Sequence, residues 1–213
     1  MPRPTTPLIS RASAVEATLR LIDDEGLESF SLPRLAKELG VRAPSLYHHF
    51  ADKAELLTEV SRRIVAETPI PDFDPDESLI EWLVVLSCNQ RRTMLRHRNA
   101  ALLVLRYLPR DTLVRLFERS ATYLEEAGVP LERQVLILDG LEKLTIGSTA
   151  AEALRPPTPR SRLFPNVTAK RYPQLRAAMD ANPLGQAELF EQTVRTFLAA
   201  AIAPSERSAA ADR

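Results

Sequence analysis

The chain has 213 residues, enough for one large domain or two smaller ones. With 45% hydrophobic and 26% charged residues it has an ordinary globular composition, which excludes disorder or a fibrous repeat as the main state. Basic and acidic residues both total 28, so the net charge alone points to no partner. No apolar run reaches the roughly 18 residues of a spanning helix, and we expect no membrane insertion.

Metal, cofactor and catalytic signals are weak. The single cysteine, Cys88, cannot form an internal disulfide, and the first ten residues lack an export signal, so we expect a cytoplasmic protein. His48 and His49 diverge by about 100° on a helix and do not easily share a metal. Cys88 and His97 would lie on opposite helix faces and make a poor dyad. We predict no metal, no cofactor and no enzymatic activity.

The apolar residues recur at helical spacing, and no alternating strand pattern with a tight glycine turn is present. Gly26, Gly40 and Gly128 each follow an apolar periodic stretch, where a helix needs its C-terminal stop. The sequence therefore predicts an all-α fold.

Two proline-rich segments divide the chain. TPIPDFDPDE at 68–77 disrupts any helix, and the acid-free stretch 155–173 with five prolines predicts a long surface loop. The basic stretch 155–176 has no assigned role. The predicted organisation is an arm at 1–9, a three-helix domain at 10–67, a connection at 68–77, a larger helical domain at 78–203 and a tail at 204–213.

The first domain carries the strongest pattern. Ser10 is placed to cap a helix that ends at Gly26, and Ser31 to cap a short helix that ends at Gly40. Pro44 then suits the first turn of a new helix. Two short helices joined by a glycine-opened turn make a helix-turn-helix, whose second helix enters a DNA major groove.

The residues around Pro44 suit contact with DNA. Leu46 and Phe50 are spaced to hold the new helix inward, which leaves Tyr47, His48 and His49 on the remaining surface. Hydroxyl and imidazole groups bind phosphates, and Ser45 can reach a base edge. Taken alone, the two histidines are better explained as a solvated helix face, and Tyr47 fits a packing residue as well as it fits a DNA contact.

The stretch LAKELGVRAPSLYHHFADKAELL, residues 35–57, resembles the tetracycline repressor (TetR) family of transcriptional regulators. The resemblance implies a helical homodimer, an N-terminal DNA-binding domain and a C-terminal ligand pocket. It places Ala43, Pro44 and Ser45 at the DNA-facing start of the recognition helix and gives Lys53 a phosphate. Charge and position add Arg34 and Arg42. The predicted DNA contacts are Arg34, Arg42, Ala43, Pro44, Ser45, Tyr47, His48, His49 and Lys53.

The C-terminal half resembles the tetracycline repressors within that family, through LRHRNAALLV, Pro109 and LTIGSTAAE. Their magnesium-binding histidine corresponds to Val104, which cannot coordinate a cation, so we predict a ligand other than magnesium–tetracycline. Eight arginines between residues 88 and 119 hint at an anionic ligand, but a solvated helix face explains them better.

Two further residue sets follow. The predicted effector pocket consists of Trp82, Leu86, Gln90, Val104, Tyr107, Leu116 and Phe117. The predicted dimer interface consists of Leu138, Leu141, Leu144, Phe190, Val194 and Phe197, although either of its two stripes could equally be intrachain core.

The predicted function is a repressor that a small molecule releases from a palindromic operator. One alternative is a helical carrier or enzyme that binds no specific DNA. Another is a DNA-binding protein whose C-terminal core is filled and takes no effector.

Overall fold

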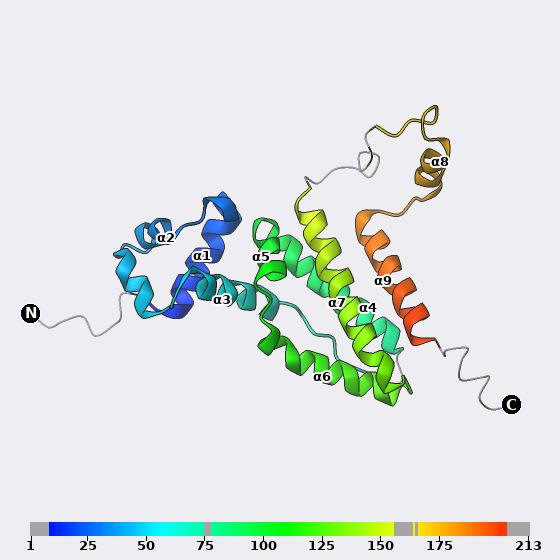
Figure 1. Ribbon diagram of the computed structural model, residues 1–213, viewed down its shortest axis with the longest axis horizontal. Helices are drawn as coiled ribbons and strands as arrows, with labels where there is room; N and C mark the ends of the chain where they lie inside the picture. The colour runs from blue at the N-terminus through cyan, green and yellow to red at the C-terminus, as the bar shows by residue number, and fades with distance from the viewer. Residues whose placement is uncertain (1–8, 75–77, 156–163, 165, 204–213) are drawn as a thin grey trace, which may run out of the picture.

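The computed structural model describes residues 9–74, 78–155, 164 and 166–203, which form helices and no β-strand. Figure 1 shows a small N-terminal group of helices, α1 to α3, beside a larger group, α4 to α9. The predicted all-α architecture is confirmed. Residues 1–8 of the predicted arm, 75–77 of the predicted connection and the predicted tail lie outside the described residues.

The N-terminal domain is built from three capped α-helices and two short 3₁₀ helices: α1 (Arg11–Glu25), η1 (Leu27–Ser29), α2 (Leu32–Glu38), η2 (Ala43–His48) and α3 (Lys53–Ala66). The Ser10, Ser31 and Asp52 side chains accept the backbone N–H groups of Ser13, Arg34 and Glu55. These bonds satisfy donors that the first helical turn leaves free.

Glycine stops three of the helices as predicted. Gly26, Gly40 and Gly128 have φ values of 84°, 66° and 74°, which side chains with a Cβ rarely adopt. After Gly40, the N–H of Val41 returns to the carbonyl of Ala36 at 3.0 Å and closes the end of α2. The next element differs from the expected α-helix, because η2 is a six-residue 3₁₀ helix.

The C-terminal domain contains α4 (Leu79–Arg96), η3 (Arg98–Ala100), α5 (Ala101–Arg106), α6 (Arg110–Glu126), α7 (Leu131–Ala153), α8 (Pro173–Ala181) and α9 (Gln186–Ile202). Helices α4, α7 and α9 pack against one another, and α6 packs mainly on α7. Gly140 permits close packing of α7 and α9, since a Cβ there would lie 2.6 Å from Cζ of Phe197.

Helix α8 was not predicted. The sequence placed a loop at 155–173 and a basic stretch up to 176, and residues 156–163 and 165 of that segment lie outside the described residues. From Pro173, a favoured first-turn residue, the chain is helical, and α8 buries none of its side chains. In Figure 1 this helix projects away from the body of the domain.

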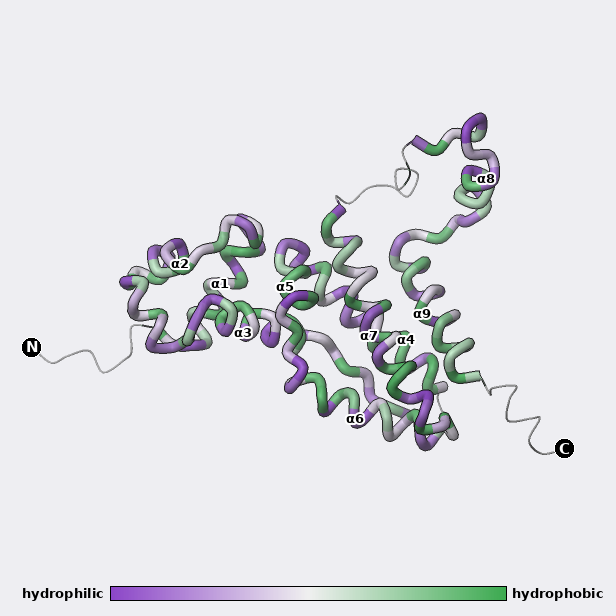
Figure 2. The backbone as a smooth tube through the Cα atoms, viewed as in Figure 1, coloured by the Kyte–Doolittle hydropathy of each residue, from purple (hydrophilic) through white to green (hydrophobic). Residues whose placement is uncertain are grey.

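Two apolar cores hold the molecule together, visible as green segments where the helices of Figure 2 approach one another. The first core joins α1, α2, η2 and α3 to Met94, Leu103, Val104 and Ile146 of the C-terminal domain. The second lies among α4, α6, α7 and α9. Because the first core crosses the domain boundary, the N-terminal domain is packed against the C-terminal domain as well as tethered to it.

Residues 68–74, here called the strap, run in an extended conformation between α3 and α4. Trp82 Nε1 donates to the carbonyl of Pro71 at 2.9 Å, and Asn89 Nδ2 donates to that of Pro69 at 2.8 Å. The Phe73 ring stacks on Tyr123 of α6, with centroids 3.7 Å apart. The strap is therefore fixed to both α4 and α6.

Candidate functional site

The recognition element η2 is anchored from beneath and exposed above. Leu46 and Phe50 are only 1% and 3% exposed and lie in the first core. Between them, Tyr47 is 57% exposed, and His48 is also exposed. His49, Ala43 and Ser45 are half-buried, and Pro44 is exposed. Leu46 and Phe50 thus fix the orientation in which Tyr47 and His48 meet solvent.

Arg11 braces this element from the start of α1, a role that the sequence did not reveal. Its guanidinium donates to the backbone carbonyl of His49 and, at 2.8 Å, to Glu55 Oε1 of α3. It also lies 4.6 Å from the centroid of the Phe50 ring. Hydrogen bonds from Ala51 N–H and Arg11 lower the pKa of Glu55, which keeps this carboxylate charged.

Lys53 begins α3 and already has a protein partner. Its Nζ donates to the carbonyl of Phe30 at 2.9 Å and lies 5.2 Å from the centroid of that ring. An ammonium has three N–H donors, so two remain for a phosphate. The contact with Phe30 therefore positions the ammonium beside the N-terminus of α3 and does not exhaust it.

Arg34 is less available for DNA than expected. Its guanidinium binds Glu25 Oε1 at 2.5 Å and Glu38 Oε2 at 2.9 Å. The hydrogen bonds that the guanidinium donates to these two carboxylates raise the pKa of Arg34. In this structure the Arg34 side chain joins the end of α1 to α2, and its contact with DNA stays a prediction.

Other cations of the N-terminal domain remain available. Arg42 and Lys37 are exposed on the two sides of the Gly40 turn, and within the described residues neither forms an ion pair.

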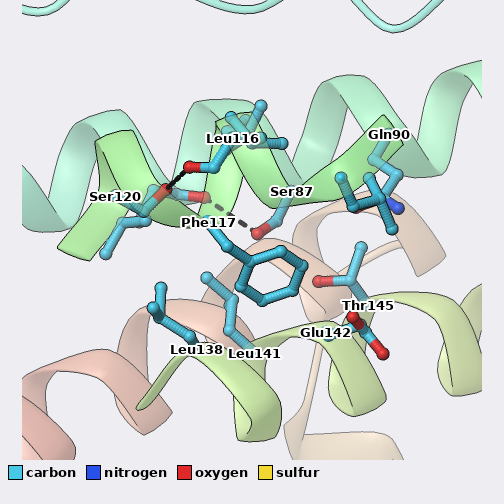
Figure 3. Close-up of a pocket in the computed structure, with 12 residues that line it drawn as sticks. Ser87, Gln90, Leu116, Phe117, Ser120, Leu138, Leu141, Glu142 and Thr145 are labelled. Carbon is cyan, nitrogen blue, oxygen red and sulfur yellow. Dashed lines mark hydrogen bonds between the residues drawn. The ribbon is translucent and has the colours of Figure 1, made fainter. Parts of the chain in front are cut away.

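A narrow cavity lies between α4, α6 and α7 (Figure 3), and the space open to the centre of a water molecule is about 60 Å³. Four of the predicted pocket residues line it, namely Leu86, Gln90, Leu116 and Phe117. The remaining lining residues, most of them apolar, are Leu83, Ser87, Leu113, Ser120, Leu138, Leu141, Glu142 and Thr145. Drug-sized ligands occupy about 300–1,000 Å³, so the cavity must widen to admit one.

Three predicted pocket residues lie elsewhere. Val104 is fully buried in the first core, and Tyr107 packs on the same core. Trp82 is 3% exposed and meets Phe73 and Tyr123 edge-on, with centroids 6.1 and 5.1 Å away. The periodicity identified them as inward-facing but could not tell which of two cores they enter.

Three of the six predicted dimer residues lie in the core of a single chain. Leu141, Phe190 and Val194 are 7%, 8% and 0% exposed and belong to the intrachain core. Leu144 and Phe197 are half-buried against that core, and Leu138 lies in the cavity wall. The large apolar side chains that α7 leaves exposed are Leu131, Val135 and Leu136, at 70%, 74% and 61%.

The arginine-rich stretch is not simply a solvated face. Arg91 Nη2 and Nε contact the Glu152 carboxylate at 2.6 and 2.9 Å, and the Arg91 side chain is 10% exposed. Arg98 donates to backbone carbonyls at the end of α7, including that of Arg155 at 2.6 Å. Both side chains link α4 and its extension to α7.

Helix α6 connects the cavity wall with the DNA-binding domain. Its first residues, Asp111 and Thr112, both contact Arg62 of α3, with 2.9 Å between Arg62 Nη1 and Asp111 Oδ2. The Asp111 hydrogen bond raises the pKa of Arg62, and the Arg62 hydrogen bond lowers that of Asp111. Further along the same helix, Leu116 and Phe117 line the cavity.

A second polar contact between the domains centres on His97 at the end of α4. Its Nδ1 lies 2.7 Å from Asp23 of α1, and its Nε2 lies 3.2 Å from Glu67 at the end of α3. Burial alone would raise the pKa of Glu67, but the His97 hydrogen bond and the neighbouring cations outweigh it and lower that pKa. These contacts orient the N-terminal domain on the C-terminal one.

The described residues also bear on metal binding and on membrane insertion. No group of three or more His, Cys, Asp or Glu residues in that part of the chain is arranged to hold a metal ion. Among the helices described there, none has the length and apolar character needed to cross a membrane.

Comparison with known proteins agrees with this geometry. The family model for bacterial regulatory proteins of the tetR family matches residues 14–60, and the model for the tetracyclin repressor-like C-terminal domain matches residues 71–199. The class E tetracycline repressor of Escherichia coli is 28% identical over 145 residues, which cover 68% of this chain and 69% of that one. The class A repressor from transposon 1721 of Escherichia coli is 27% identical and covers 84% of both.

The fold is also shared with solved structures. Apo ActR from Streptomyces coelicolor superposes with a TM-score of 0.78 at 23% identity, covering 93% of this chain and 97% of that one. ActR has also been solved in complex with actinorhodin. Since the C-terminal model alone matches more than half of the chain, this protein belongs to the tetR family of regulators and is a helix-turn-helix DNA-binding protein, not an enzyme.

Proposed function

We propose that the protein is a homodimeric repressor that a small molecule, bound between α4, α6 and α7, releases from a palindromic operator. Each η2 element enters a major groove through Tyr47 and His48, while Lys53 and Arg42 bind phosphates. The half-sites are then about 34–36 Å apart or a multiple of that distance. We expect the protein to act on DNA in the cytoplasm.

The observation that carries this proposal is the double role of α6. One end of the helix contributes Phe117 and Leu116 to the cavity, and the other end contributes Asp111 to the ion pair with Arg62 of α3. The cavity is too small for a drug-sized ligand, so a ligand must displace α6 or its side chains. Such a displacement acts on α3 and biases the spacing of the two recognition elements.

Dimerisation is proposed through the outer faces of α7 and α9. Leu136 is the exposed apolar residue best placed for it on α7, and the half-buried Leu144 and Phe197 border the same pair of helices. Leu136→Arg is expected to yield a folded monomer in sedimentation-velocity experiments. A dimer of unchanged stability would move the interface to another face.

The test of function begins with selection of a randomised duplex pool on the purified full-length protein. An enriched palindrome supports the regulator, and no enrichment at low salt contradicts it. Asp111→Asn then tests the route through α6, since this variant should bind operator and ligand but release DNA less completely. Asp139→Asn is the matched control, because Asp139 pairs with the neighbouring surface residue Lys143 at 2.6 Å and forms no other ion pair among the described residues.

The proposal is supported by ActR, which shares this fold and has been solved in complex with actinorhodin. A filled-core protein without an effector is the remaining alternative, and it predicts no ligand-dependent release for any variant.

A further inference from the structure

The wall of the cavity between α4, α6 and α7 has two chemically different ends. Figure 3 shows Gln90, Glu142 and Thr145 gathered at one end and Leu138 and Leu141 toward the other, with the Phe117 ring between them. Ser87 and Ser120 are already satisfied, since each donates to the carbonyl four residues earlier at 2.8 and 2.9 Å. The free polar capacity therefore lies at the first end.

Thr145 is the clearest sign of an unmet polar contact. Its side chain is 1% exposed, and Oγ1 has no hydrogen-bond partner among the described residues. Other buried helical threonines avoid this cost, since Thr18 and Thr149 donate to carbonyls four residues earlier at 2.8 and 2.6 Å. A buried hydroxyl without a partner is unfavourable, and a ligand group at this end would satisfy it.

Glu142 gives the same end a negative charge. Its side chain is 12% exposed, and its one ion pair within the described part of the chain is with Arg110, which lies 3.6 Å away and is 76% exposed. No lysine, arginine or histidine lines the cavity itself in the described part of the chain. An exposed partner at that distance is screened by water and does not offset the carboxylate on the cavity side.

From this arrangement we propose that the effector is a flat apolar molecule carrying a protonated amine, which binds Glu142 and Thr145, and that carboxylates are rejected. The proposal rests on the ligand-responsive function above and specifies its ligand class. The amine donates to the Glu142 carboxylate and to Thr145 Oγ1, and such charge-assisted bonds are the stronger kind. The apolar body lies on Phe117 and the leucines.

The shape of the cavity also limits the ligand. A second hollow of about 120 Å³ toward α3 shares Leu86, Gln90, Leu113 and Leu116 with the first. A slender body that turns the Phe117 ring aside can extend from one hollow into the other.

Three probes with one aromatic body test the charge preference: 2-naphthylmethylamine, 2-naphthalenemethanol and 2-naphthoate. Isothermal titration of the full chain should give the tightest binding for the amine, with about tenfold or more over the carboxylate. Glu142→Gln should weaken the amine about tenfold and change the alcohol by less than about threefold. Glu118→Gln, an exposed acid outside the cavity, is the matched control and should change neither.

Thr145→Val distinguishes the effect of the hydroxyl on ligand binding from its effect on the stability of the fold. This variant keeps the shape of the side chain and removes the unpartnered oxygen, so its melting temperature should not fall while amine binding weakens severalfold. The proposal is overturned if naphthoate binds as tightly as the amine, if Glu142→Gln retains the preference, or if no probe binds at about 1 mM.

Operator binding, followed by fluorescence anisotropy in the same samples, keeps the two proposals distinguishable. Amine-selective binding that leaves the operator complex intact supports the ligand class and refutes ligand-responsive repression. Release of the operator by naphthoate but not by the amine supports repression and refutes the ligand class.

Discussion

Leu46 and Tyr47 are neighbours in the recognition element, and their alanine variants should fail in opposite ways. Leu46 is 1% exposed in the first core, so Leu46→Ala removes buried apolar atoms and leaves a cavity. Such a change costs about 2–5 kcal/mol of unfolding free energy. Tyr47 is 57% exposed, and Tyr47→Ala should change the unfolding free energy by no more than about 0.5 kcal/mol.

For the affinity for DNA we expect the larger direct loss from Tyr47→Ala, the variant that leaves stability almost unchanged. A tyrosine hydroxyl bound to a charged phosphate contributes about 1.5–3 kcal/mol, which is roughly tenfold or more in affinity. Because a dimer presents two recognition elements, Tyr47→Ala should weaken operator binding about 100-fold in total. Leu46→Ala should lower the melting temperature by roughly 4–20 °C, because about 2–5 kcal/mol is lost and each kcal/mol shifts a chain of this size by about 2–4 °C.

Urea unfolding and operator anisotropy, measured on the same preparations below the melting transition, give the two quantities. The reasoning fails if Tyr47→Ala binds the operator within about twofold of the unchanged protein. It also fails if Leu46→Ala loses no stability, since η2 would then not depend on the core beneath it. Val85→Ala, at a 42% exposed site on α4, is the control for a harmless truncation.

Three other predictions concern charges. Lys53→Ala should lower the slope of log affinity against log salt concentration by about 1.8, since the dimer loses two phosphate contacts of about 0.9 each, and an unchanged slope would remove Lys53 from the phosphate contacts. Arg91→Met should cost about 3 kcal/mol by urea unfolding, because it leaves Glu152 partly buried without its partner, and the additional change Glu152→Gln should recover most of that loss. The folded-state pKa of Glu67 lies below its ordinary value of 4.5, so the stability from its ionised form is present above pH 4.5 and is lost as the pH falls through the folded-state pKa. Urea unfolding from about pH 6 to pH 3 should show this loss, and Glu67→Gln should reduce it.

The local features of the fold followed from the sequence. Caps and stops depend on one residue and its near neighbours, which is why Ser10, Ser31 and Gly40 were placed correctly. The 3₁₀ form of η2 did not follow, because a six-residue element takes its geometry from the packing of Leu46 and Phe50 on other helices.

The tertiary features were harder to predict. Helical periodicity shows that Val104 and Val194 face inward, but the choice between cavity, core and dimer interface depends on which helices meet there. The ion pairs of Arg34 and Arg91 were not predicted for a related reason, since their carboxylate partners, Glu25 and Glu152, are 9 and 61 residues away. Lys53 kept its predicted position at a helix N-terminus, while its contact with Phe30 was invisible in the sequence.

The strap at 68–74 bears on how regulators of this kind can be recombined. Its prolines have no N–H group, yet the Pro69 and Pro71 carbonyls are held by Asn89 and Trp82, side chains of the domain that follows. By its contacts the strap therefore belongs to the C-terminal domain, and the structural boundary between the two domains lies before it, near Glu67.

A chimaera that joins a foreign DNA-reading head at residue 67 keeps these hydrogen bonds and the stacking of Phe73 on Tyr123. A junction placed within the strap breaks these hydrogen bonds and this stacking, and the transferred domain then loses its connection to α6. The transferred DNA-binding domain still needs residues equivalent to Arg62 and Glu67. Those side chains contact Asp111 and His97 of the C-terminal domain, and through these contacts a ligand-induced change could reach the new DNA-binding domain.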